Sequence, residues 1–243
     1  MVKKGPKQVP ESLKKLQARI DQSKQHREKA LKDLEAQKSA LSAEAQSKAE
    51  KYLQEYIHAE TESAENHAKA KKNSQFWVDP EPKVLLVVRI KGINKIAPKP
   101  RKVLKLFRLL QLHNAVLIKN NKATRNMLRL IEPFVTFGYP SVETISRLVY
   151  KRGFIKVNKQ RIPLNDNVQI HQVLGSKGIN TVEDLIHQLV NCGEHFKECN
   201  NTLWTFKLSS PLKGFVHKRT SYIQGGDWGD REKKINELVS RML

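Results

Sequence analysis

Acidic residues are absent from 49 consecutive positions, Lys83 to Ile131, where 13 lysines and arginines occur. The flanking regions mix both signs, because residues 1–75 and residues 132–243 each hold 16 basic and 11 acidic side chains. The net charge of the 243-residue chain is +21, so more than half of it arises in the acid-free stretch. Such a charge is self-repelling until an anionic partner neutralises it, which favours a nucleic acid or an anionic membrane surface as the partner.

Cysteines and long apolar runs are scarce as well. Only two cysteines occur, Cys192 and Cys199, which excludes a scaffold built on disulfides. No run approaches the roughly 20 apolar residues of a membrane-spanning helix. Residues 1–15 have no apolar core of the kind found in secretory signals. We therefore expect a cytosolic or nuclear protein.

Glycine and proline are absent from residues 11–79, which are rich in Ala, Lys, Glu, Gln, Leu and Ser. Most of these residues favour helices, and one helix over residues 11–72 would be roughly 90 Å long. Its large apolar residues are too sparse to hold a heptad repeat, so no self-contained coiled coil is predicted. We expect residues 1–75 to form a basic helical arm that is solvated and partly frayed until it lies along a partner.

Residues 76–243 are expected to form a globular domain whose core, residues 84–138, alternates strands and helices. Val84–Val88 is an apolar run too short for a helix and indicates a central strand buried on both faces. Ala115–Ile118 and Phe134–Phe137 indicate two more strands, with helical patterns between the three. This βαβαβ order predicts an α/β (α+β) sandwich of the split-βαβ type. Further helices and a short strand are predicted in the extension, residues 139–243.

The helix predicted over Arg101–His113 has two chemically distinct faces. One face carries Arg101, Lys105 and Arg108. The opposite face carries Val103, Leu106, Phe107 and Leu110. We expect the apolar face to pack on the sheet and the row of cations to point away from it.

Six longer segments, in this order, resemble a known family: VVRIKGINKIAPKPRKVLKLFRLL, LIEPFVTFGYPS, LVYKRGF, TVEDLIHQ, FKLSSP and YIQGGDWGDRE. They are similar to the eukaryotic cytosolic members of a universal family of large-subunit ribosomal proteins. The small bacterial member, numbered thirty, corresponds only to residues 84–138, and the N-terminal arm also fits the eukaryotic form. The resemblance implies a ferredoxin-like core in a structural protein that binds and helps fold large-subunit rRNA and contacts neighbouring large-subunit ribosomal proteins. It also implies a cytoplasmic, ribosomal location with assembly in the nucleolus.

Two basic groups are the candidate contacts to RNA phosphates, because a folded RNA is recognised by its shape and backbone more than by its bases. The first group comprises Arg89, Lys91, Lys95, Lys99, Arg101, Lys102, Lys105 and Arg108, with Lys119 and Lys122 further along the chain. The second group comprises Arg147, Lys151, Arg152, Lys156, Lys159 and Arg161. A merely solvated surface usually interleaves both signs of charge, and the acid-free stretch does not.

The remaining motifs do not indicate a metal site, a phosphate-binding loop or an active site. The spacing of His187, Cys192, His195 and Cys199 lacks the paired C-x2-C of a zinc site, so no metal is expected. GGDWGD at residues 225–230 follows no predicted strand and is interpreted as a sharp connector rather than a phosphate loop. Trp77 and Trp204 could stack on bases, but burial beside apolar neighbours is the expectation for both. The sequence shows no Ser/His/Asp or paired-carboxylate pattern typical of an active site, so we expect no enzyme activity, no cofactor and no small-molecule substrate.

Two alternative functions are weighed against the ribosomal one. A ribosome-assembly factor of the same fold would be expected to lack the tail YIQGGDWGDRE, which is present here. A protein that binds a membrane surface would need a broader apolar face on the arm than this Ala-rich segment has. The ribosomal interpretation is therefore preferred, with no membrane partner.

Overall fold

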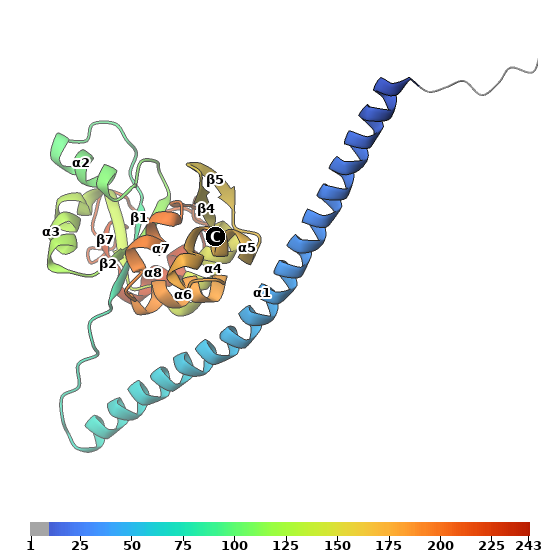
Figure 1. Ribbon diagram of the computed structural model, residues 1–243. Helices are drawn as coiled ribbons and strands as arrows, with labels where there is room; N and C mark the ends of the chain where they lie inside the picture. Colours follow the sequence, from blue (N-terminus) through green and yellow to red (C-terminus); the bar gives the residue numbers. More distant parts are fainter. Residues whose placement is uncertain (1–9) are drawn as a thin grey trace, which may run out of the picture.

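The computed structural model describes residues 10–243, so the first nine residues of the predicted arm lie outside the described residues. A mixed sheet forms the centre of a globular part, with helices on both of its faces. One long helix leaves this part and extends well beyond it (Figure 1).

The central sheet has five strands in the order β6-β2-β1-β3-β7. They are β1 (Val84–Arg89), β2 (Asn114–Lys119), β3 (Val135–Gly138), β6 (Phe206–Lys207) and β7 (Gly229–Asp230). β1 is antiparallel to both of its neighbours, β2 and β3. β2 and β3 therefore run in the same direction on either side of β1. The helix α3 (Lys122–Ile131) joins them, and the predicted split-βαβ core is confirmed.

Helices form a layer on each side of this sheet (Figure 1). One side is covered by α2 (Pro98–Leu106) and α3. The other side is covered by α4 (Val142–Arg152), α5 (Asn167–Leu174), α6 (Val182–Asn191), α7 (Phe196–Thr202) and α8 (Ile235–Ser240). A separate hairpin consists of β4 (Phe154–Val157) and β5 (Gln160–Pro163). Short 3-10 turns occur at η1 (Glu132–Phe134), η2 (Gly175–Lys177) and η3 (Glu232–Lys234).

The side chains of β1 alternate between the two helical layers, because successive residues of a strand point to opposite faces. Leu85 and Val87 belong to the apolar cluster shared with α2 and α3. Leu86 and Val88 belong to the larger cluster shared with α4 to α8. All six residues of β1 are buried, which confirms the predicted central strand with two covered faces.

The helix predicted over Arg101–His113 corresponds to α2, which begins earlier, at Pro98, and ends sooner, at Leu106. Phe107 follows as its C-cap, and Arg108 adopts the left-handed conformation with φ 59°, which turns the chain out of the helix. Arg108 therefore does not continue the row of cations on α2.

The packed face of α2 also differs from the prediction. Val103, Leu104 and Phe107 are buried, which is one face at spacings i, i+1 and i+4. Leu106 and Leu110 were expected to pack on the sheet but are 63% and 57% exposed. That expectation was wrong for two reasons. It placed the buried face on the side of Val103 that carries Leu106, whereas the buried face carries Leu104. It also extended the helix as far as Leu110, which follows the end of α2.

The arm forms α1 (Glu11–Lys72), a single helix over the predicted span. Residues 11–40 are exposed, in keeping with the expected solvated helix. Further along, α1 passes beside α5 and α6 (Figure 1). The helix therefore has a packing partner within the chain, which was not predicted.

Asp184 at the start of α6 is the centre of this contact. Its carboxylate accepts hydrogen bonds of 2.8 Å from both Lys48 Nζ and Tyr52 Oη of the arm. The Tyr52 ring stacks on His187, with 4.1 Å between the ring centroids. Burial raises the pKa of Asp184, but the hydrogen bonds from Lys48, Tyr52 and Thr181 together hold it below its ordinary value. The division of the chain into an N-terminal extension, residues 1–75, and a globular domain, residues 76–243, stays a prediction.

Replacing Leu104 by alanine should lower the free energy of unfolding by roughly 2–5 kcal/mol, because the change removes buried apolar atoms and leaves a cavity. Leu106→Ala, on the other side of the same helix, should change it by less than about 0.5 kcal/mol because Leu106 is exposed. Chemical denaturation of the two variants would measure the difference. Equal losses would mean that α2 packs through a different face.

Replacing Asp184 by asparagine should loosen the arm at pH 7, because a carboxylate whose pKa is depressed on folding stabilises the fold above its unfolded pKa. The wild-type contact should weaken only as the pH falls below 3.8 toward the lowered pKa. Faster amide exchange across residues 44–56 would report the change.

Asp166→Asn is the matched control, since Asp166 also pairs with the arm, through Lys38 at 2.9 Å, but both side chains are at least 40% exposed. An exposed ion pair contributes little, so this variant should exchange like the wild type. Unchanged exchange in Asp184→Asn would show that this carboxylate does not hold the arm.

Candidate nucleic-acid interface

The cations of the acid-free stretch have few carboxylates near them in the folded chain. Within residues 10–243, Arg125 is the one residue of Lys83–Ile131 that forms an ion pair, with Glu81 at 2.7 Å. Folding therefore does not neutralise this charge by bringing acids from elsewhere. The stretch keeps a surface to which anions are attracted.

The first basic patch is formed by side chains of α2 and of the loop before it, most of them exposed. Its members are Lys91, Lys95, Lys99, Arg101, Lys102 and Lys105. Lys91 is half-buried, and its pKa is lowered by that burial and by the nearby positive charge of Arg219. Two cations held close together without a carboxylate repel each other until an anion binds.

Arg219 and Lys218 were not predicted as part of this surface. They belong to the long segment after β6, in which Phe215 packs against the apolar cluster of the α4 to α8 side. Lys218 Nζ lies 4.7 Å from the centroid of the Phe215 ring, which stacks on His113 at 5.9 Å. The signal was present in the sequence, because residues 199–226 contain no acid. Only the fold, however, brings Arg219 close enough to Lys91 to lower the pKa of that ammonium.

Arg89 does not join the patch, although it was among the predicted contacts. It is 3% exposed and its guanidinium donates hydrogen bonds to the carbonyl oxygens of Lys91, Gly92, Leu109 and Leu110. Its pKa is lowered by burial. Arg89 therefore fastens the loop before α2 to the loop after it, and a phosphate cannot replace those four contacts at low cost.

Arg108 is likewise directed inward. Its guanidinium donates to the carbonyl oxygens of Leu203 at 2.9 Å and Asn200 at 2.8 Å, at the end of α7. Burial lowers its pKa as well. Arg108 thus links the end of α2 to the extension and is not on the predicted row of α2 cations.

The second patch is centred on the β4–β5 hairpin. Lys156 and Arg161 are directly opposite each other in its register, and the Arg161 guanidinium lies 3.7 Å from the centroid of the Phe154 ring. Lys151 and Lys159 are exposed nearby in sequence. Like charges opposite each other in a sheet are destabilising, so this pair fits a site that binds an anion.

Four other residues that were predicted to contact RNA phosphates are less well placed to do so. Arg147 pairs with Glu143 at 3.3 Å, and Arg152 donates to the carbonyl oxygen of Leu243 at 2.8 Å. Lys119 is opposite Val84, at the far end of the β1–β2 pair from Arg89, and Lys122 follows it. The structure therefore does not bring Lys119 and Lys122 together with the α2 patch.

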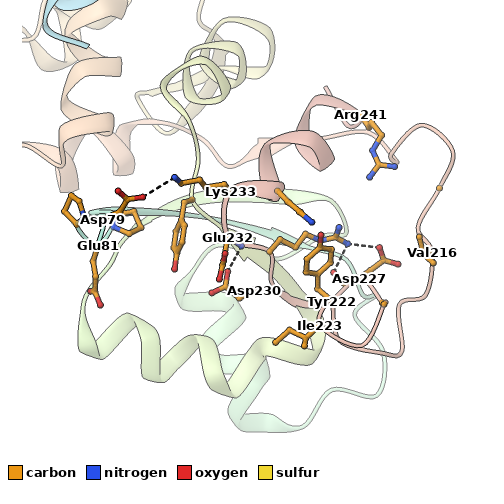
Figure 2. Close-up of a pocket in the computed structure, with 18 of the residues that line it drawn as sticks. Asp79, Glu81, Val216, Tyr222, Ile223, Asp227, Asp230, Glu232, Lys233 and Arg241 are labelled. Atoms are coloured by element: carbon orange, nitrogen blue, oxygen red, sulfur yellow. Dashed lines mark hydrogen bonds and ion pairs between the residues drawn. The ribbon is translucent and has the colours of Figure 1, made fainter. Parts of the chain in front are cut away.

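A hollow lined by acids lies between the linker after α1, η3 and the segment after β6 (Figure 2). Its carboxylates come from Asp79, Glu81, Asp227, Asp230 and Glu232. Figure 2 shows Asp79 and Glu81 on one side, Asp230 and Glu232 in the middle, and the apolar side chains of Val216 and Ile223 on the loop opposite. Val216 and Ile223 are 83% and 91% exposed. The lining also includes Arg231, Lys233, Lys234 and Arg241, so the hollow mixes both signs of charge and differs in kind from the two basic patches.

Among the four residues considered as zinc ligands, the two histidines contact carboxylates and the two cysteines are free thiols. His187 Nε2 lies 3.1 Å from a Glu55 carboxylate oxygen of the arm, and His195 Nδ1 lies 2.9 Å from Glu198. Cys199 is buried, which raises the pKa of its thiol to about 12. Across residues 10–243, no group of three His, Cys, Asp or Glu side chains is arranged to hold a metal ion. Nor does any helix in that range combine the length and the apolar character needed to cross a membrane.

Both tryptophans that were expected to be buried are partly exposed. Trp77 and Trp204 each expose 38% of their surface, so the expectation of burial was wrong for both. Trp77 is on the linker, where its Nε1 donates to Asp79 at 3.2 Å. Trp204 is at the end of α7, next to the second patch.

Comparison with known proteins agrees with the sequence resemblance. Residues 85–135 match the model of the family described as ribosomal protein L30p/L7e, and residues 9–80 match that of the ribosomal L30 N-terminal domain. The large ribosomal subunit protein uL30 of Tetrahymena thermophila is 53% identical over 197 residues, which is 81% of this chain and 82% of that protein. The chain belongs to the ribosomal protein L30p/L7e family.

Other relatives extend the match over nearly the whole chain. Large ribosomal subunit protein uL30 of Dictyostelium discoideum is 47% identical over 96% of this chain and 95% of its own length. That of Drosophila melanogaster is 46% identical over 97% and 94%. These relatives are ribosomal proteins and not assembly factors, so membership confirms the expected fold and the role as a structural constituent of the large subunit.

Proposed function

We propose that this chain acts in the large ribosomal subunit by holding large-subunit rRNA between its two basic patches. The observation that carries the proposal is the exposed cationic surface of α2 and its loop, which has no carboxylate partners within residues 10–243. Lysines and arginines that neutralise phosphates release condensed counterions, which favours binding without any base being read. No chemical step is required of the protein.

Cooperation between the two faces of α2 is the physical basis of this role. Val103 and Leu104 fix the helix to the sheet, so Arg101, Lys102 and Lys105 are presented at a constant spacing. A rigid array of cations selects one arrangement of phosphates, and in that way it can stabilise one fold of the rRNA. We propose that the protein does this in cytoplasmic ribosomes and joins the precursor particle in the nucleolus.

We further propose that a neighbouring ribosomal protein occupies the acid-lined hollow. Lysine- or arginine-rich segments with apolar side chains are complementary to its carboxylates and to exposed Val216 and Ile223. A lining of both signs suits the mixed side chains of a protein segment better than the uniformly negative backbone of RNA. The hollow of about 1360 Å³ is large enough for an extended peptide segment rather than a single side chain.

The triple variant Arg101→Glu, Lys102→Glu and Lys105→Glu should remain folded but bind large-subunit rRNA weakly, since all three side chains are exposed. Wild-type affinity should fall by about three decades between about 50 and 200 mM salt. The salt slope of the variant should be lower by about three, one for each phosphate that it no longer neutralises. Filter binding over a salt series would measure both quantities.

A matched control reverses three exposed cations beside the acid-lined hollow, Lys233→Glu, Lys234→Glu and Arg241→Glu. Net charge changes by the same amount in both triple variants, so any difference reports position rather than total charge. The control should keep most of the wild-type salt slope. Equal weakening of both variants would show that net charge alone governs binding and would remove the case for the α2 patch.

A carbodiimide, which joins a carboxylate to an amine in direct contact, should link the hollow to a neighbouring protein in intact large subunits. We expect cross-linked peptides that contain Glu81 or Glu232 and a lysine of another ribosomal protein, detected by mass spectrometry. Asp33, on the exposed first half of α1, serves as a comparison carboxylate. Cross-links from Glu81 and Glu232 only to lysines of this chain, such as Lys233, would contradict the protein-partner proposal.

A further inference from the structure

A groove borders the second basic patch and includes no side chain of the α2 patch. It lies between the segment after α2, the edge strand β6 and the β4–β5 hairpin, and has a volume of about 740 Å³. Pockets that hold small ligands measure about 300–1,000 Å³. The groove is therefore too small for an RNA helix but of a size for a single nucleotide unit.

Trp204 forms an aromatic wall of this groove. Its backbone N–H donates to the carbonyl oxygen of Phe154 at 2.8 Å, and the preceding residue, Leu203, forms a β-bridge with Ile155. These contacts fix the residue against the hairpin, while the 38% exposure leaves part of the ring uncovered. An aromatic side chain that is held in place and partly exposed is a platform on which a base can stack.

The charge around Trp204 is entirely positive. Lys156, Arg161 and Lys207 line the groove, and no carboxylate from residues 10–243 does. Arg108 adds a cation whose hydrogen bonds go to carbonyl oxygens and therefore leave its charge uncompensated. The direct opposition of Lys156 and Arg161 costs stability in the free protein, and an anion between them would relieve it.

Three side-chain amides, Gln111, Asn114 and Asn201, also line the groove. Each amide offers both a donor and an acceptor, the combination that the edge of an unpaired base can match. Aromatic surface, cations and amides thus converge on one cavity. A base within a duplex cannot use all three, because its faces are stacked and its edge is paired.

We propose that this groove binds one unpaired nucleotide of an RNA, with its base against Trp204 and its phosphate between Lys156 and Arg161. The inference rests on the proposed function, since the nucleotide would belong to the RNA that the basic patches hold. It adds a site that recognises a base flipped out of a helix or lying in a loop. The basic patches alone would bind phosphates without regard to pairing.

The test compares the full chain with the variants Trp204→Ala and Trp204→Phe on two probes. The probes are a single-stranded, fluorescently labelled oligouridylate and an RNA duplex of the same length, with binding followed by fluorescence anisotropy. Trp204→Ala should weaken oligouridylate binding roughly 5- to 150-fold, the range for loss of one stacked base, and should leave duplex binding within about twofold of wild type. Trp204→Phe keeps an aromatic face and should lose less than Trp204→Ala.

Trp77→Ala is the matched control, because Trp77 has the same 38% exposure but is on the linker, outside the groove. It should bind both probes as the wild type does. If oligouridylate binding is unchanged in Trp204→Ala, or if both probes are weakened equally, the inference is overturned.

A second measurement covers the case in which Trp204→Ala does not fold, as judged by circular dichroism. Wild-type protein is photo-cross-linked to an oligouridylate that carries 4-thiouridine, and the adduct is located by mass spectrometry. We expect the adduct at Trp204 or at a residue adjoining it in the groove, and adducts confined to α2 would overturn the inference.

The outcome also separates this inference from the proposed function. Suppose that Trp204→Ala binds oligouridylate as the wild type does, while the wild type binds large-subunit rRNA and the α2 triple variant does not. The nucleotide site is then disproved and the proposed function stands. If the wild type does not bind large-subunit rRNA, both the proposed function and the nucleotide site are disproved.

Discussion

Burial of β1 on both of its faces is the constraint on which the rest of the structure depends. Leu85 and Val87 require one layer of helices and Leu86 and Val88 require another, so the sheet must lie between two layers. Packing on the first side fixes α2 through its apolar face, and its cations are then left on the only face that remains open. Core formation and display of charge are therefore two results of one arrangement.

Carboxylates and cations have different tasks in this molecule. Several carboxylates connect parts of the chain: Asp184 holds the arm, Glu81 pairs with Arg125, and Asp227 pairs with buried Arg231 at 2.7 Å. The cations of α2 and of the β4–β5 hairpin have no such partners among the residues described. Their mutual repulsion persists in the free chain and decreases when an anion binds, which increases affinity for a polyanion.

Buried arginines show why a charge count along the sequence overestimates a binding surface. Arg89 and Arg108 look like their neighbours in the sequence, yet their guanidinium groups reach carbonyl oxygens inside the protein. A planar group with five donors can satisfy several carbonyl groups at once, which the single ammonium of lysine does less readily. Arg108 thereby connects the end of α2 to the end of α7, and a patch derived from the sequence loses two of its members to the interior.

Local pattern by itself determined much of this protein: the uninterrupted helix of residues 11–72, the central strand β1, the split-βαβ order and the acid-free stretch that carries the charge. These features depend on composition and on periods of two or 3.6 residues, which are visible in a short window. Only the tertiary structure decided the rest. The two-residue strands β6 and β7 exist because they pair with β2 and β3, and the buried face of α2 was settled by contact with the sheet. The hydrogen bonds of Asp184 with the arm and of Trp204 with the hairpin, and the electrostatic influence of Arg219 on Lys91, likewise join residues far apart in sequence. Such pairings depend on how the whole chain packs, so no local pattern of residues specifies them.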